Sequence, residues 1–148
     1  MDSDNTSYAI AAARHNQDGK ILLSAERIDN AICHFAFSAE CTLKAFWEAF
    51  QEMNNRFPEV KFVHEEKELN KFLRDYYWLT VLNPTLAFLS GLETIPNILF
   101  QDHPHRRYYD NQNYTAEEIE KSKHYSEKLL QRLVECTLDG QYNMQSDI

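Results

Sequence analysis

The sequence predicts an all-α fold, built as an up-and-down bundle of four or five helices. Glycine and proline number only 3 and 4 among 148 residues, which argues against a turn-rich all-β chain. Apolar residues recur at steps of three and four over most of the chain, which is the spacing of one face of an α-helix. Amphipathic helices joined by short connections pack best antiparallel, and this favours the bundle.

The length predicts one domain, because 148 residues can bury one core and are too few for two of ordinary size. We expect this single domain to span 1–148, with its core at about 6–138 and a flexible tail at 139–148. The 15 Lys and Arg against 23 Asp and Glu give a net charge of −8, which excludes a generally basic nucleic-acid-coating protein. Any contact with nucleic acid must therefore come from a local patch.

The first residues lack a secretory signal, and no stretch approaches the roughly 18 apolar residues of a membrane span. We therefore expect a cytoplasmic protein without membrane contact. The three cysteines, Cys33, Cys41 and Cys136, are odd in number and form no CxxC pair. This favours reduced core residues over a disulfide framework or a structural zinc site.

The first two helices have the clearest signals. Thr6 or Ser7 can cap a helix that runs to about Leu23, unless Asp18-Gly19 breaks it. A longer helix is predicted from about Ala25 to Met53, where Asn54-Asn55 and Pro58 end it. Its apolar face consists of Ile28, Ile32, Phe35, Ala39, Leu43, Phe46 and Phe50.

The second half of the chain is less regular. A third helix is predicted over 61–79, and Asn83-Pro84 favours a short helix to about Leu92. Residues 95–113 are expected to form an irregular connection, and long loops of this kind are often functional. Thr115 and Glu118 form a capping-box pattern that starts a last helix, which ends at about Leu138. Its inward face is expected to hold Ile119, Tyr125, Leu129, Leu130, Leu133 and Val134.

The long predicted helix carries two candidate site residues. Arg27 and His34 are seven positions apart, so they would stand on one side of a helix, about 20° from each other. Arginine can stabilise the negative charge of a phosphate, and histidine can move protons at neutral pH. The alternative is that Arg27 pairs with an acidic residue and His34 forms an ordinary hydrogen bond. Glu40 lies on the opposite border of the apolar face, where Lys44 offers an i,i+4 ion pair.

The segment 25–45 resembles the second helix of HEPN domains (higher eukaryotes and prokaryotes nucleotide-binding). The positions that fit are Arg27, Asp29, Ala31, His34, Glu40, Cys41, Leu43, Lys44 and Ala45. His64 ahead of Leu69 and the step from Arg107 to Tyr108 agree more weakly, and the resemblance covers roughly 8–135. It implies an all-α bundle, commonly a homodimer or a partner of a small nucleotidyltransferase, in defence, toxin-antitoxin or RNA-processing systems.

The resemblance leaves two functions open. The first is a helical module that dimerises and binds a nucleotide, RNA or a protein partner. The second is a metal-independent ribonuclease, because catalytic members of the superfamily bear Arg and His with four to six residues between them. Arg27 and His34 form the only such match in this chain, although the motif usually lies near the final helix.

The predicted connection carries a basic cluster, His103, His105, Arg106 and Arg107. These side chains are candidates for phosphate binding, and the alternative is a solvated polar loop. Pro104 would hold the chain extended and send both histidines to the same side, but no third metal ligand stands at a familiar spacing. Walker, GxGxxG, GxSxG and HExxH motifs are absent, so we expect no cofactor and no metal.

Overall fold

The computed structural model describes residues 7–49, 55–82 and 96–138, and side chains for 7–49, 55–75 and 96–135. These residues form α-helices and short 3-10 turns, and contain no strand. The α-helices are α1 (Tyr8–Ser24), α2 (Ile28–Ala49), α4 (Glu66–Leu82) and α5 (Ala116–Leu138), and the 3-10 turns are η1 (Val60–Phe62), η4 (Asn97–Leu99) and η5 (His105–Tyr108). The predicted all-α class is confirmed.

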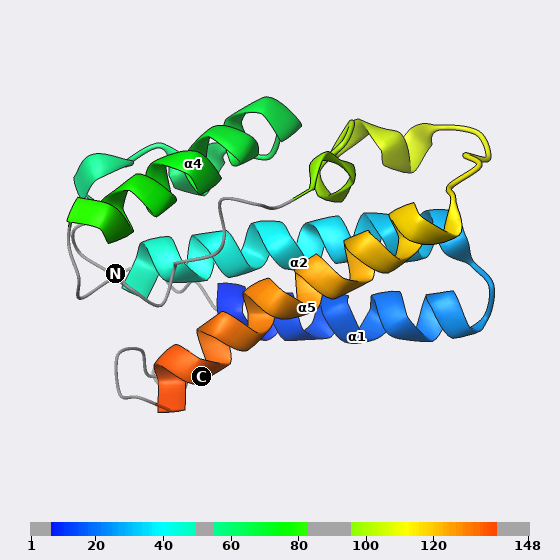
Figure 1. The fold of residues 1–148 in the computed structure, drawn as a ribbon, viewed down its shortest axis with the longest axis horizontal. Helices are drawn as coiled ribbons and strands as arrows, with labels where there is room; N and C mark the ends of the chain where they lie inside the picture. Colours follow the sequence, from blue (N-terminus) through cyan, green and yellow to red (C-terminus); the bar gives the residue numbers. More distant parts are fainter. Residues whose placement is uncertain (1–6, 50–54, 83–95, 139–148) are drawn as a thin grey trace.

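The order of the helices differs from an up-and-down bundle. α1 and α2 form an antiparallel pair, whereas α4 and α5 run in the same direction as α2 (Figure 1). The segments 50–65 and 83–115 separate α2, α4 and α5 along the chain. The up-and-down prediction assumed mostly short connections, whereas these two are long.

The capped start of α1 is as predicted, because the Ser7 side chain accepts a hydrogen bond from the Ile10 N–H at 3.2 Å. The helix continues through Asp18 and Gly19 to Ser24, so the alternative break does not occur. Gly19 is buried where α1 crosses α2. A Cβ atom on it would lie 2.6 Å from Cε1 and 2.8 Å from Cδ1 of the fully buried Phe35.

Replacing Gly19 with alanine is expected to destabilise the fold by about 1–3 kcal/mol. The gain in helix propensity of about 1 kcal/mol is outweighed because the Phe35 ring is enclosed and cannot move away without repacking. Urea unfolding of Gly19→Ala beside the exposed-site control Ala13→Ser, expected within about 0.5 kcal/mol of the parent, measures the difference. A stabilised Gly19→Ala protein would contradict the close packing of α1 and α2.

The predicted start of the long helix at Ala25 is wrong, because α2 begins at Ile28. The N–H groups of Ala25, Glu26 and Arg27 are bonded to carbonyls of residues 21–23 and close the last turn of α1. Glu26 has a φ of 61°, which reverses the chain. Arg27 therefore precedes α2 and does not lie on its surface. The predicted end near Met53 lies outside the described residues.

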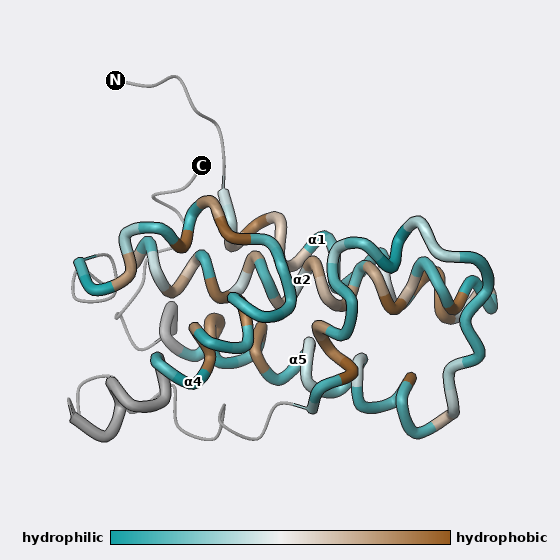
Figure 2. The backbone as a smooth tube through the Cα atoms, turned by 90° about the horizontal axis from the view of Figure 1, so that it is seen from above, coloured by the Kyte–Doolittle hydropathy of each residue, from teal (hydrophilic) through white to brown (hydrophobic). Residues whose placement is uncertain are grey.

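The core lies between α2 and the elements that pack around it. Its most buried large side chains come from α2, α4, α5 and the residues after η4, and include Phe46, Leu43, Leu69, Phe72, Phe100, Leu129 and Leu133. Figure 2 shows polar and apolar residues alternating along α1 and α5, as expected of helices that bury one side. Val134 of α5 is 42% exposed, so its predicted inward position is wrong.

The later elements follow the prediction with shifted bounds. α4 begins at Glu66, after the turn η1, and not at Lys61. The capping box is confirmed, because the Glu118 N–H donates to Thr115 Oγ1 at 3.1 Å and the Thr115 N–H donates to Glu118 Oε1 at 2.9 Å. The short helix predicted from Asn83 to about Leu92 lies outside the described residues, as does the 139–148 tail. None of the described helices has the length and apolarity needed to cross a bilayer.

Candidate functional site

A buried ionic cluster lies at the centre of α2. Glu40 and Lys44 are only 5% and 2% exposed, and Lys44 Nζ lies 2.7 Å from Glu40 Oε2. The predicted i,i+4 ion pair is therefore confirmed, but it lies inside the protein and not at its surface. Two histidines from other elements complete what we call the Glu40 network: His64 Nδ1 is 2.7 Å from Oε2, and His103 Nε2 is 2.8 Å from Oε1.

The contacts of Glu40 fix its protonation state. Burial alone would raise the pKa of this carboxyl, but hydrogen bonds from His103, Lys44 and His64 and the charge of Lys44 lower its pKa to about 2. A carboxylate oxygen only accepts hydrogen bonds, so each histidine nitrogen that contacts it carries a proton. Burial in turn lowers the pKa of His103, against the opposing effect of Glu40. The network is thus an ionised carboxylate that accepts hydrogen bonds from one cation and two imidazoles.

A pocket of about 560 Å³ opens above this network, and we call it the Glu40 pocket. Its lining residues are Phe37, Glu40, Phe62, His64, Glu65, Pro104 and Arg107. Lys44 and His103 lie beneath, where they hold the carboxylate, while the side chain of His64 is 58% exposed. The pocket combines a charged floor, aromatic walls and one exposed guanidinium.

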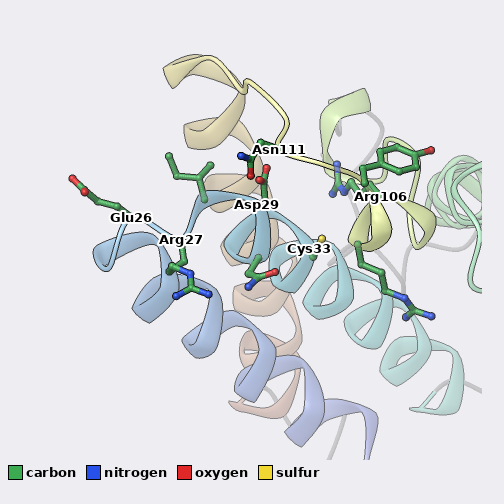
Figure 3. Close-up of a pocket in the computed structure, with 10 residues that line it drawn as sticks. Glu26, Arg27, Asp29, Cys33, Arg106 and Asn111 are labelled. Atoms are coloured by element: carbon green, nitrogen blue, oxygen red, sulfur yellow. The ribbon is translucent and has the colours of Figure 1, made fainter.

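A second pocket, of about 420 Å³, lies at the start of α2, and we call it the Arg106 pocket. It is lined by Glu26, Arg27, Ile28, Asp29, Asn30, Cys33, Arg106, Arg107, Tyr109 and Asn111. Figure 3 shows Arg27 and Arg106 on opposite sides of it, with Asp29 and Cys33 of α2 between them. Three of the predicted candidates, Arg27, Arg106 and Arg107, therefore line one pocket.

Arg106 is the most constrained of these three side chains. It is 5% exposed and donates to the carbonyls of Ile98 at 2.9 Å and Leu99 at 2.7 Å, with a longer contact of 3.5 Å to Ile32. It thereby ties the 98–106 segment to α2. Its Nε–H is buried and has no hydrogen-bond partner. Burial lowers the pKa of this guanidinium, but the group stays charged because the ordinary pKa of arginine is very high. Among the described acidic residues none forms an ion pair with Arg106, so the carbonyls of Ile98 and Leu99 are its nearest acceptors.

The four residues of the predicted basic cluster do not act together. His103 is buried in the Glu40 network, and Arg106 is buried on the carbonyls of the neighbouring turn. His105 is exposed and lies 3.5 Å from Glu65, and Arg107 is exposed over the rings of Phe37 and Tyr108, at 5.8 and 4.8 Å. The prediction that both histidines point to the same side is wrong. Pro104 has ψ near 3° and begins the turn η5, so the backbone is not extended there.

Arg27 and His34 also lie in different surroundings. Arg27 is exposed before the helix starts, whereas His34 contacts α1 through His15, with 3.0 Å between their Nδ1 atoms. Burial and the neighbouring His34 lower the pKa of His15. His34 does not line the Arg106 pocket. A phosphate held there by Arg27 would therefore have no imidazole from His34 at the pocket wall.

The cysteines on α2 have the core character that the sequence predicted. Cys33 is 8% exposed, and burial raises its pKa. Burial and the charge of Glu40 raise the pKa of Cys41 to about 11. Both thiols thus stay protonated at neutral pH, which disfavours a nucleophilic role. Cys136 lies outside the residues whose side chains are described.

His64 is the site residue that the sequence did not single out as functional. Its only signal was the weak agreement with the HEPN pattern ahead of Leu69. In the structure it belongs to the Glu40 network, 24 positions from its carboxylate partner. Among the described residues, no group of three or more His, Cys, Asp or Glu side chains is arranged so that it could hold a metal ion.

The chain was compared with protein-family models, with curated proteins and with solved structures, and none of the three comparisons gives a match.

Proposed function

We propose that the protein is a helical binding module for a phosphate-bearing ligand, a nucleotide or RNA, and that the phosphate binds in the Arg106 pocket. The observation that carries this proposal is that Arg27, Arg106 and Arg107 all line one pocket at the start of α2. Arg106 contributes positive charge to this pocket, while its own N–H donors are bonded to carbonyls or closed to solvent.

The chemistry of the lining supports a phosphate. Guanidinium groups bind phosphate oxygens through paired N–H donors, and the first N–H groups of an α-helix attract anions because they have no intrahelical acceptor. Arg27 stands at the position before α2, and its side chain cannot accept hydrogen bonds from those groups. The first N–H groups of α2 are therefore open to another acceptor, which water or a bound phosphate can supply.

The remaining lining residues suit the rest of a nucleotide. Asn30 and Asn111 offer amide donors and acceptors, and Tyr109 is 46% exposed beside the arginines, where a base can stack on its ring. Asp29 accepts a hydrogen bond from the Gln112 N–H at 3.3 Å and retains lone pairs for a ribose hydroxyl. Two carboxylates, Glu26 and Asp29, also disfavour a bare polyanion, so a ligand with one phosphate and neutral polar groups fits best.

Three parts of the proposal rest on the HEPN resemblance alone: assembly as a homodimer, pairing with a small nucleotidyltransferase, and a place in a defence or toxin-antitoxin system. They stay predictions. The Arg106 pocket is formed by one chain, so ligand binding can be tested without knowing the partner.

Binding of adenosine monophosphate, followed by calorimetry at low ionic strength, tests the function. Removing either exposed guanidinium, in Arg27→Ala or Arg107→Ala, is expected to weaken binding about tenfold or more, because hydrogen bonds to charged groups contribute roughly 1.5–3 kcal/mol. Arg106 is left intact because it also ties the fold together.

Arg14→Ala is the matched control, since Arg14 is exposed on α1 and does not line this pocket. Its affinity should equal that of the parent within about twofold. Absence of binding by the parent, or equal losses in all three variants, would contradict the proposal. Inorganic phosphate as a second ligand shows whether the phosphate group alone is recognised.

A further inference from the structure

The Glu40 network fixes the orientation of the His64 ring and determines which of its nitrogens carries a proton. Its Nδ1 contacts Glu40 Oε2 at 2.7 Å and lies 3.2 Å from Lys44 Nζ. Because the carboxylate is ionised and is the nearer group, Nδ1 carries the proton. In neutral His64 the outer nitrogen, Nε2, is therefore an unprotonated hydrogen-bond acceptor, and a carboxylate bonded to the other ring nitrogen also fixes the ring orientation.

Maintaining this arrangement has a high energetic cost. Two charged side chains, Glu40 and Lys44, are almost completely buried, and desolvation of such a pair can cancel its Coulomb attraction. A hydrophobic pair of similar volume would serve packing as well. What the charged pair adds, besides its hydrogen bonds, is an oriented imidazole at the edge of a pocket.

The other walls of the Glu40 pocket are aromatic, cationic at Arg107 and anionic at Glu65, whose carboxylate lies 3.5 Å from His105. Phe62 is 75% exposed, and Phe37 and Pro104 provide further apolar surface. Arg107 is exposed, with its guanidinium over the Phe37 ring at 5.8 Å, and it reaches the same space. A large aromatic side chain exposed beside a free cation and an oriented imidazole is the composition of a ligand pocket.

We propose that the Glu40 pocket is a second binding site, which takes a small planar aromatic anion that also carries an O–H or N–H donor. The ring packs against Phe37 and Phe62, the anionic group binds Arg107, and the donor bonds to Nε2 of His64. The two pockets share Arg107 and no other lining residue, so Arg27→Ala is the variant that distinguishes this site from the nucleotide proposal. An aromatic ring together with an anionic group and a donor occurs in aromatic hydroxy acids and in nucleotides, and the test below separates these sources.

The probe is 4-hydroxybenzoate, with benzoate and 4-hydroxybenzyl alcohol as analogues that lack the donor or the anion. Binding is measured by calorimetry at pH 7.5, and the ring signals of His64 are followed by NMR. We expect 4-hydroxybenzoate to shift the His64 signals. Benzoate should bind about fivefold more weakly, and the alcohol about tenfold, as expected for one neutral and one charged hydrogen bond.

Two substitutions locate the probe. His64→Ala should remove the preference for 4-hydroxybenzoate over benzoate, and Phe62→Ala should weaken both about fivefold, since its ring contributes apolar contact area. Phe62 is largely exposed and outside the Glu40 network, so its removal leaves the fold intact. His105→Ala is the matched control, because His105 is an exposed imidazole that does not line the pocket.

Further measurements separate the two possible kinds of ligand and the two proposed binding sites. If adenosine monophosphate shifts the His64 signals and Phe62→Ala weakens it, the ring in this pocket is a nucleobase. If only 4-hydroxybenzoate does so, the ligand is an aromatic acid. Arg27→Ala should leave 4-hydroxybenzoate binding unchanged even if nucleotide binding is lost. Absence of binding, unshifted His64 signals, or parent-like affinity in Phe62→Ala would overturn this second site.

Discussion

Replacing Lys44 with methionine is expected to lower the free energy of unfolding by about 3–5 kcal/mol, which is the usual cost of leaving one partner of a buried ion pair behind. The ammonium group is 2.7 Å from Glu40 Oε2 and is the only lysine or arginine partner that the described structure gives this carboxylate. His64 and His103 would remain as hydrogen-bond donors, and burial lowers the pKa of His103 and so disfavours its cationic form. The ionised carboxylate would thus lie in the core without a countercharge.

The double variant Glu40→Gln, Lys44→Met separates lost charge balance from lost packing. With a neutral amide in place of the carboxylate, we expect a smaller loss than in Lys44→Met alone, because no buried charge remains. Lys20→Met is a surface control. Its ion pair with Glu127 is exposed, with side-chain values of 41% and 36%, so its loss should stay below about 1 kcal/mol. Urea unfolding of all three variants measures these differences, and a Lys44→Met variant as stable as Lys20→Met would refute the buried network.

The sequence predicts the helices well because their signals are local. The step of three and four in α2, the Ser7 cap and the Thr115–Glu118 box each depend on residues within one or two turns. The same locality explains the i,i+4 prediction for Glu40 and Lys44. Their burial was not foreseen, because it depends on His103 and His64, which are 63 and 24 positions from Glu40.

The candidate site was predicted in part for the same reason. Arg27 reaches the pocket because α1 extends its last turn through Arg27 and α2 starts only at Ile28, and hydrophobic periodicity does not resolve such a boundary. Adjacent basic residues gave a cluster in the sequence, but the turn at Pro104 sends His103 inward and leaves His105 outside. A run of basic residues shows that positive charge is present in a segment, but the direction of each side chain depends on the backbone torsions, which the run does not reveal.

Acid is expected to destabilise the protein in two stages, the first from buried histidines and the second from Glu40. The first stage comes from His15 and His103, whose pKa values burial lowers in the folded protein. Below the ordinary value of 6.5, the unfolded chain binds protons that these folded histidines do not take up. The free energy of unfolding therefore falls as the pH decreases from about 7 to 5.

The second stage comes from Glu40, whose pKa is about 2 in the fold against an ordinary 4.5. A carboxyl with a depressed pKa stabilises the fold fully above its unfolded pKa, and this stabilisation is lost as the pH falls from 4.5 towards 2. At 1.36 kcal/mol for each unit, the loss is about 3 kcal/mol. Urea unfolding at intervals from pH 7.5 to 2.5 should show both stages in the parent.

Glu40→Gln should remove the second stage, because an amide does not titrate, and should leave the contribution of His15 in the first. Glu65→Gln is the matched control: Glu65 is an exposed carboxylate on the same pocket, so the parent profile should persist. A parent-like slope below pH 4.5 in Glu40→Gln would place the low carboxyl pKa on another residue. The carboxylate would then be no fixed acceptor for His64, and the oriented imidazole on which the second binding site depends would lose its support.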